Sequence, residues 1–276
     1  MRPRVIIGIL IVVLVVGGLG FGGFKVYQRV DELFTPERCY YTVDPEEVQT
    51  LTAEQATNAS IIVAASYEAG LPEQAAVIAL TTAWQESGLR NLDHGDRDSL
   101  GLFQQRPSYG WGTEEEIMDP WYSSLRFYEE LVKFDDWEGQ DITEMAQKVQ
   151  RSGFPDAYRK HETKAIALTG SLRGTRPASL ACIDRKDKHG DAEVFARVVD
   201  QVPGVAVSQE RGAVMLAADE EEDLWAATQL ALANTRQGGI VEATLPDHTW
   251  KQGMQSWKNT PGSGERGQAV IRLNES

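Results

Sequence analysis

Residues 84–113, WQESGLRNLDHGDRDSLGLFQQRPSYGWGT, carry the strongest structural signal in this chain. They join the end of a predicted helix to a segment rich in glycine and polar residues. The helix begins at Pro72, a residue favoured at the first helical position, and ends before Gly88. The acidic residue Glu86 therefore occupies the last turn of a helix predicted over 72–87.

Glu86 has the sequence surroundings of a proton donor. On its predicted face, successive turns back along the helix carry the small residues Thr82, Ala79 and Ala75, which let another element pack closely. Removal of water disfavours the charged carboxylate and raises its pKa. The partial negative charge at a helix C-terminus acts in the same direction. We therefore expect Glu86 to carry a proton at neutral pH.

The polar segment after Gly88 supplies carboxylates for a second role. Cleavage of a glycosidic bond needs one carboxylic acid to protonate the leaving oxygen, and a group that stabilises or traps the positive sugar carbon. Glu86 is the candidate for the first role, and Asp93, Asp96 and Asp98 are candidates for the second. The competing interpretation is a turn or cap role, which is usual for Asp near glycine.

Two short motifs resemble a known family. The pair Glu86-Ser87, followed by Gly-Leu-Phe-Gln at 101–104, resembles the Glu-Ser and Gly-Leu-Met-Gln motifs of soluble lytic transglycosylases and goose-type lysozymes. The resemblance covers residues 50–170, and the long form is similar to actinobacterial membrane-anchored wall proteins. It implies a lysozyme-like fold, with Glu86 as general acid/base, Ser87 as the residue that orients it, and Gln104 in the glycan cleft.

The same resemblance ranks the other carboxylates. The stretch Gly-Asp-Arg-Asp-Ser at 95–99 is similar to the acidic loop of goose-type lysozymes, which makes Asp96 and Asp98 the better second carboxylates. The chain departs from the family where Phe103 replaces the usual Met, which keeps an apolar filler. It also lacks the Ala-Tyr-Asn-Ala-Gly motif. In its place, the resemblance puts Tyr158 in the cleft by analogy of position.

A cluster of planar side chains follows the second motif. Amides at Gln104 and Gln105 are suited to sugar hydroxyls, and the rings of Tyr109 and Trp111 are suited to stacking on sugar rings. We therefore include these residues, with Ser87 and Tyr158, among the candidate substrate-binding residues. A structural role competes, in which Trp111 fills the core.

The N-terminal residues predict a membrane anchor. Val5–Phe24 is an uncharged run of 20 residues, which as a helix spans about 30 Å, the thickness of a bilayer core. Arg2 and Arg4 precede it, so residues 1–4 are expected in the cytoplasm and the bulk of the chain outside the cell membrane. The alternative is a cleaved signal peptide, although the run is longer than the usual apolar h-region of a signal peptide and no Ala-x-Ala cleavage site follows.

The expected export of the chain predicts that the two cysteines form a disulfide, because exported thiols are usually paired. A disulfide between Cys39 and Cys182 is expected to close most of the first domain into one loop. In the chain-entropy model such a bridge contributes roughly 4–5 kcal/mol of stability. The alternative is two unpaired buried thiols.

The remaining pattern predicts two folded domains after the anchor. A juxtamembrane linker (25–49) leads into a lysozyme-like domain (50–172), and a linker (173–190) leads into a small α+β domain (191–276). The predicted fold class is thus a mainly α lysozyme-like domain (α+β) after a single transmembrane helix, followed by a small α+β domain. Helices of the first domain are expected at 52–69, 72–87, 120–134, 143–152 and 155–172. The second domain is expected to hold helices at 191–202 and 220–236, and strands at 205–208, 213–217, 240–251 and 268–273.

Charge and spacing exclude several function classes. The formal net charge of −14 argues against nucleic acid, which is bound by clustered Lys and Arg. The four histidines lack metal-ligand spacing, so neither a metal nor another cofactor is expected. Ser87 and Ser99 lack the Gly-x-Ser-x-Gly elbow of many serine hydrolases.

The sequence therefore predicts a membrane-anchored enzyme that cleaves peptidoglycan between N-acetylmuramic acid and N-acetylglucosamine. Two mechanisms stay open. A lytic transglycosylase needs one carboxyl because the muramic 6-hydroxyl traps the sugar, whereas a lysozyme needs a second carboxylate to position water. The alternative function is a non-catalytic glycan-binding or scaffold protein, with cell-wall assembly proteins as partners of its C-terminal domain.

Overall fold

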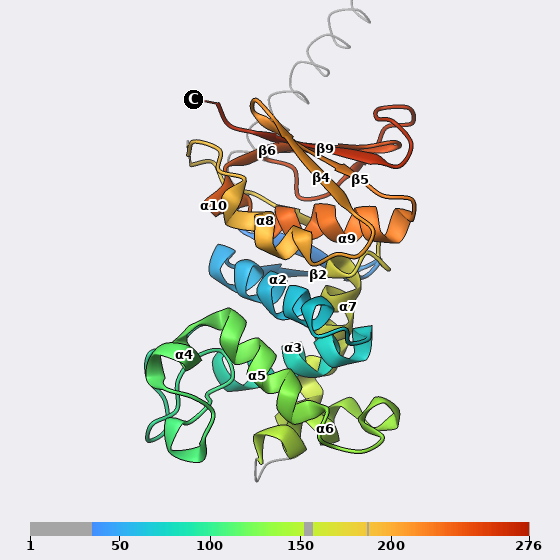
Figure 1. Ribbon diagram of the computed structural model, residues 1–276. Helices are drawn as coiled ribbons and strands as arrows, with labels where there is room; N and C mark the ends of the chain where they lie inside the picture. The colour runs from blue at the N-terminus through green and yellow to red at the C-terminus, as the bar shows by residue number, and fades with distance from the viewer. Residues whose placement is uncertain (1–34, 152–156, 187, 276) are drawn as a thin grey trace, which may run out of the picture. The chain divides into compact units, whose positions relative to one another are not determined.

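The computed structural model of the chain describes residues 35–151, 157–186 and 188–275 (Figure 1). This part of the chain contains nine α-helices and two antiparallel sheets. Residues Glu37–Ser276 belong to one compact unit. The expected membrane span over residues 5–24 lies outside the described residues. Among the described helices, none is long and apolar enough to cross a membrane.

The helices before residue 173 begin and end close to the predicted positions. Two of the helices in this region begin with a capping box, formed by Thr52 with Gln55 and by Thr113 with Glu116. The Asp119 side chain caps the helix that starts at Pro120. The predicted helices are α2 (Ala53–Glu68), α3 (Glu73–Ser87), α5 (Pro120–Leu131), α6 (Ile142–Gln150) and α7 (Arg159–Leu172). A further short helix, α4 (Glu114–Met118), lies outside the predicted ranges. Two short 3-10 helices, η1 (Pro107–Tyr109) and η2 (Trp137–Gly139), lie in the connections.

The predicted disulfide is confirmed, and it lies in a small sheet. Strands β1 (Cys39–Asp44), β2 (Glu47–Leu51) and β3 (Leu180–Cys182) pair in the order β2-β1-β3. Cys39 lies directly opposite Cys182 in the β1–β3 register, and the two sulfur atoms are bonded. The segments expected as linkers thus supply strands, because residues 25–49 contain β1 and 173–190 contain β3.

The C-terminal strands form the second sheet, in which the segment predicted as one strand over 240–251 is divided into two strands. The strand order of this sheet is β4-β5-β9-β6-β7-β8. Helices α8 (Glu193–Asp200) and α9 (Glu221–Leu232) lie between this sheet and α2 (Figure 1). A short helix, α10 (Thr235–Gly238), leads into β6. The strands are β4 (Ala206–Glu210), β5 (Ala213–Ala217), β6 (Ile240–Leu245), β7 (His248–Lys251), β8 (Lys258–Asn259) and β9 (Gln268–Leu273).

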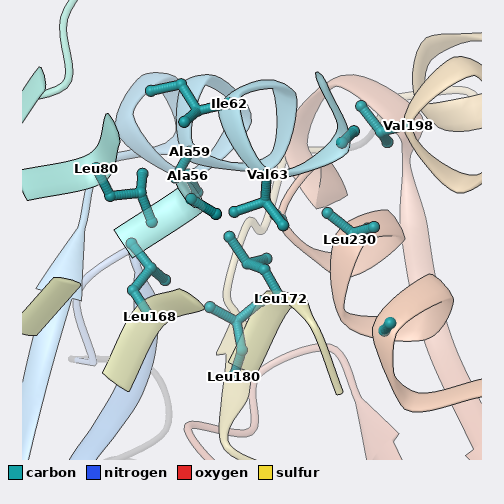
Figure 2. Packing of buried hydrophobic residues seen from close by; sticks show 14 of the residues in the cluster. Ala56, Ala59, Ile62, Val63, Leu80, Leu168, Leu172, Leu180, Val198 and Leu230 are labelled. Carbon is teal, nitrogen blue, oxygen red and sulfur yellow. The ribbon is translucent and has the colours of Figure 1, made fainter. Parts of the chain in front are cut away.

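One continuous core joins the helical and sheet-rich parts. Figure 2 shows Leu172 of α7 between Val63 of α2 and Leu180 of β3. Val198 of α8 and Leu230 of α9 lie to the right of these residues in the same view. All five side chains are nearly or completely buried. The helices α8 and α9 therefore contribute to the same core as α2 and α7.

A buried glutamine reinforces this junction. The Gln229 side chain on α9 has no exposed surface. Its amide nitrogen donates to the carbonyl oxygens of Ser171 (2.6 Å) and Arg176 (3.0 Å). Its amide oxygen accepts from the backbone N–H groups of Ser179 (3.0 Å) and Leu180 (2.8 Å). These four bonds tie α9 to the segment between α7 and β3.

The predicted fold class is therefore wrong. Instead of a mainly α domain followed by a separate small α+β domain, residues 37–276 form one mixed α/β unit. Two features account for the difference. Strands β1 and β3 are short and pair across a separation of 143 residues, which no local pattern reveals. Helix α9, predicted as amphipathic, is buried at every position from Leu224 to Leu232, so it packs on the sheet and also on α7.

Candidate active site

Glu86 lies in the last turn of α3, as predicted, and this turn is fixed by hydrogen bonds at the helix end. The N–H of Gly88 donates to the Trp84 carbonyl (3.1 Å), and the N–H of Leu89 donates to the Ala83 carbonyl (3.1 Å). Helix α3 packs along α6 and α7, and its small residues are buried where these helices meet. The close approach predicted from the small residues is thus present.

Among the residues that the structure describes, the carboxyl of Glu86 has one hydrogen-bond partner, the hydroxyl of Tyr158. This hydroxyl donates to Oε1 of Glu86 at 2.5 Å. Tyr158 immediately precedes α7, and only 1% of its surface is exposed. Burial raises the pKa of Glu86, while the hydrogen bond from Tyr158 acts in the opposite direction. The site combines a carboxyl whose pKa is raised with a hydroxyl that can stabilise the carboxylate.

Ser87 fastens the motif loop to the helix. Its hydroxyl donates to the Leu102 carbonyl (2.7 Å), with the Ala83 carbonyl 3.0 Å away, and accepts from the backbone N–H of Arg90 (3.3 Å). Ser87 therefore acts on the position of Glu86 through the backbone, by connecting α3 to residues 101–104.

The Gly-Leu-Phe-Gln motif forms a tight loop against the helices. Backbone bridges join Leu92 to Gly101 and Leu100 to Gln105. Gly101 has a φ of 77°, and a Cβ there would lie 2.7 Å from the Ile117 carbonyl oxygen, so glycine is required.

The last two residues of this motif point in different directions. Phe103 is fully buried and stacks on Phe127, with 4.8 Å between ring centroids. The carbonyl of Phe103 accepts from the side-chain amide of Gln150 (3.0 Å). Gln104, at a φ of 49°, donates from its side chain to the His94 carbonyl (3.3 Å). Phe103 is thus part of the core, whereas the half-buried side chain of Gln104 bonds to the loop that precedes the motif.

The two preferred second carboxylates have different surroundings. Asp98 accepts from Nε of Arg106 (2.7 Å) and from the backbone N–H of Ser108 (2.9 Å). Hydrogen bonding from Ser108, and then from Arg106, holds the pKa of Asp98 well below its usual range. Asp96 is exposed to solvent. Asp93, the third candidate, pairs with His94 at 2.8 Å on the surface.

The remaining predicted substrate-binding residues lie on the same polypeptide segment. Gln105 is buried and donates to the Ser123 carbonyl (3.0 Å), so it holds the loop against α5. Tyr109 is exposed over 57% of its surface, and the Arg106 guanidinium lies 4.3 Å from its ring centroid. Trp111 is partly buried against the core.

Two contacts beside Glu86 escaped the sequence analysis. Nε2 of His161 lies 3.1 Å from Oε1 of Gln85, and the ammonium of Lys164 lies 4.3 Å from the ring centroid of Trp84. Burial, and then the charges of Lys164 and Lys160, lower the pKa of His161 to about 4. His161 is thus neutral at neutral pH. The helical spacing of Tyr158 and His161, one turn apart, was the available signal that both face α3.

Comparison of the sequence with descriptions of known protein families and with curated proteins finds no match. In the part of the chain that the structure describes, no three His, Cys, Asp or Glu side chains are grouped so as to hold a metal ion.

Proposed function

We propose that this protein is an enzyme that cleaves the glycan strands of peptidoglycan, with Glu86 as general acid and then base. The single observation that carries the proposal is the half-buried Glu86 side chain, with its raised pKa and its hydrogen bond from Tyr158. A general acid works best when its pKa lies near the working pH, and the burial of Glu86 moves its pKa in that direction.

The proposed reaction begins with transfer of the Glu86 proton to the glycosidic oxygen. The bond from this oxygen to the muramic acid carbon breaks, its electron pair stays with the leaving oxygen, and positive charge develops on the sugar. The Tyr158 hydroxyl stabilises the new carboxylate. Glu86 then takes a proton from the nucleophile, which is either water or the muramic 6-hydroxyl, and so returns to its starting form.

The surroundings of Asp98 favour the transglycosylase over the lysozyme mechanism. Its two oxygen atoms already accept hydrogen bonds from Arg106 and Ser108, so its charge is largely satisfied within the protein. A reaction in which the muramic 6-hydroxyl traps the sugar needs one carboxyl. Asp96, which is exposed, stays the candidate for positioning water in the lysozyme mechanism.

We also propose that the enzyme acts outside the cytoplasmic membrane, anchored by residues 5–24. The disulfide between Cys39 and Cys182 supports export, because such bonds persist in oxidising compartments. Tethering near the wall would supply a high local concentration of substrate.

The test uses the full-length chain with purified peptidoglycan and mass spectrometry of the released fragments. We expect anhydro-muropeptides from the wild type, whereas reducing-end muropeptides would indicate the lysozyme mechanism. Glu86→Gln should lower the rate at least about 100-fold, the usual contribution of a general acid. Glu144→Gln, on the exposed side of α6, is the matched control and should leave the rate unchanged.

One outcome would favour the alternative function. If the folded wild type releases no fragments but sediments with the wall, the protein is a glycan-binding or scaffold protein. The absence of the Ala-Tyr-Asn-Ala-Gly motif is the observation on the side of this alternative.

A further inference from the structure

A second candidate site lies in the C-terminal sheet. A cavity of about 350 Å³ opens between the start of α9, the turn that joins β6 to β7, and the loop before β9. Its volume is within the range of pockets that bind small molecules. Apolar lining comes from Trp225, Leu245 and Pro246. Glu86 and its partners do not line it.

The walls of this cavity are fixed by specific contacts. The Trp225 ring meets His248 edge-on, with 5.3 Å between centroids, and Trp257 in the same way at 5.0 Å. The loop before β9 is fastened by the Ser263 hydroxyl, which donates to the Leu245 carbonyl (2.8 Å). A preformed apolar wall of this kind loses little entropy when a ligand binds.

Gly267 closes the loop against the end of β5. Its carbonyl accepts from the N–H of Ala218 (3.0 Å), and its φ is 73°. A Cβ at this position would lie 3.1 Å from the Ala218 carbonyl oxygen. This close approach brings Arg266, the preceding residue, to the rim of the cavity.

Charges of both signs line the cavity. Glu221 accepts from the Trp225 indole N–H (3.3 Å), and Asp247 accepts from the N–H of Gly262 (3.1 Å). Asp219 also lines the cavity. Arg266 lines it as well, yet within the described residues it forms no ion pair with any of these carboxylates. Charges of opposite sign that do not pair with one another in the described residues thus line one cavity.

We propose that this cavity binds a small zwitterion, namely an amino acid or short peptide with a free ammonium and a free carboxylate. Arg266 would bind the carboxylate, and Asp219 would bind the ammonium together with the other two carboxylates. An apolar side chain would pack on Pro246 and Ala218, the half-buried apolar residues of the lining. This inference goes beyond the proposed function and does not depend on it, because the cavity shares no residue with the Glu86 site.

The test is calorimetric titration of the full-length chain with three probes. These are the dipeptide alanyl-leucine with free ends, its N-acetyl form, and its C-terminal amide. We expect saturable binding of the free dipeptide and at least about tenfold weaker binding of each blocked form, the loss of one charged contact.

Substitutions assign each charge to its residue. Arg266→Gln should weaken the free dipeptide about tenfold and leave the amide unchanged, because the amide has no carboxylate. Asp219→Asn should weaken the free dipeptide and the amide but leave the N-acetyl form unchanged. Arg211→Gln, in the turn between β4 and β5, is the control because Arg211 does not line the cavity.

Several results would overturn the proposal. They are no saturable binding of the free dipeptide to the wild type, equal binding of the blocked forms, or an equal loss in Arg211→Gln. Thermal midpoints of all variants should match that of the wild type, since Arg266, Asp219 and Arg211 are exposed side chains.

Discussion

The carboxyl of Glu86 is subject to two opposing effects. Burial favours the neutral acid, which can donate a proton, and the hydroxyl of Tyr158 favours the carboxylate. The first effect is the larger, so the pKa of Glu86 is raised. Any change at Tyr158 should therefore alter the pH dependence of the reaction as well as its rate.

Removal of the Tyr158 hydroxyl should move the Glu86 titration to higher pH. In Tyr158→Phe the carboxylate loses a stabilising hydrogen bond, so the pKa of Glu86 rises further. The reaction needs the protonated acid, and we expect the high-pH limb of the kcat/KM profile to shift upward. The rate at the optimum should fall about tenfold, because the new carboxylate is less stabilised.

The control for this prediction is Tyr109→Phe, which removes a hydroxyl from an exposed tyrosine. It should leave the position of the limb unchanged. A limb that stays in place or moves to lower pH in Tyr158→Phe would contradict the assigned role of Tyr158.

At the scale of elements, the α3–α7 contact contains a histidine that resists protonation. The ordinary pKa of 6.5 is lowered to about 4 for His161 in the folded protein. Between these values the unfolded chain binds more protons than the folded one, so stability is lost as the pH falls through this window. At neutral pH the contribution of His161 is fully present.

Replacement of His161 should remove part of this acid sensitivity. In His161→Gln, we expect the urea midpoint to fall less between pH 7.5 and pH 4.5 than it does in the wild type. His189→Gln, at an exposed histidine, is the matched control and should behave as the wild type. An unchanged pH dependence in His161→Gln would show that the folded protein accepts a proton at His161 without cost.

The Gln229 side chain ties the α9 helix to four backbone groups between α7 and β3. In Gln229→Leu, buried backbone groups of Ser171 and Leu180 lose their partners, and we expect a loss of about 3–5 kcal/mol in the free energy of unfolding. Gln201→Leu, at the half-buried position after α8, removes a single hydrogen bond to the Arg197 carbonyl (3.3 Å) and should change it by less than about 0.5 kcal/mol. Urea titration measures both. A Gln229→Leu variant as stable as the wild type would mean that water replaces the lost bonds.

At the scale of the whole molecule, the disulfide closes a loop of 143 residues around most of the helices. Replacement of Cys39 and Cys182 together by Ala should lower the free energy of unfolding by about 4–5 kcal/mol, chiefly by freeing the unfolded chain. Urea unfolding of both proteins under non-reducing conditions measures this loss. A difference below about 1 kcal/mol would show that the unfolded chain is already restricted by residual structure.

Local signals were sufficient to predict most of the helices and the partial burial of Glu86. Apolar spacing, capping boxes and proline at a first turn mark α2, α5 and α6, and the small residues of α3 anticipated a close neighbour. The disulfide was predicted because the chain has two cysteines and was expected to be exported. These features depend on residues close together in sequence or on composition.

The features that were missed depend on contacts between distant residues. The pairing of β1 with β3 and the packing of α9 on α7 join segments that local patterns treat as separate, so the fold class was wrong. In the candidate site, the hydrogen bond from Tyr158 to Glu86 links residues 72 positions apart. Ser87 and Gln105 hold the loop through hydrogen bonds to backbone carbonyls of residues distant in sequence, which the sequence alone does not show.

The central place of β1 in its sheet has a consequence for biosynthesis. A chain made from its N-terminus exposes Cys39 early, and Cys182 follows 143 residues later. At about 5–20 residues per second, this interval lasts roughly 7–30 s. Throughout it, Cys39 is an unpaired thiol at the start of β1, a strand whose β3 partner has not yet been made. Correct maturation therefore depends on an oxidant that acts late, after the second cysteine has emerged.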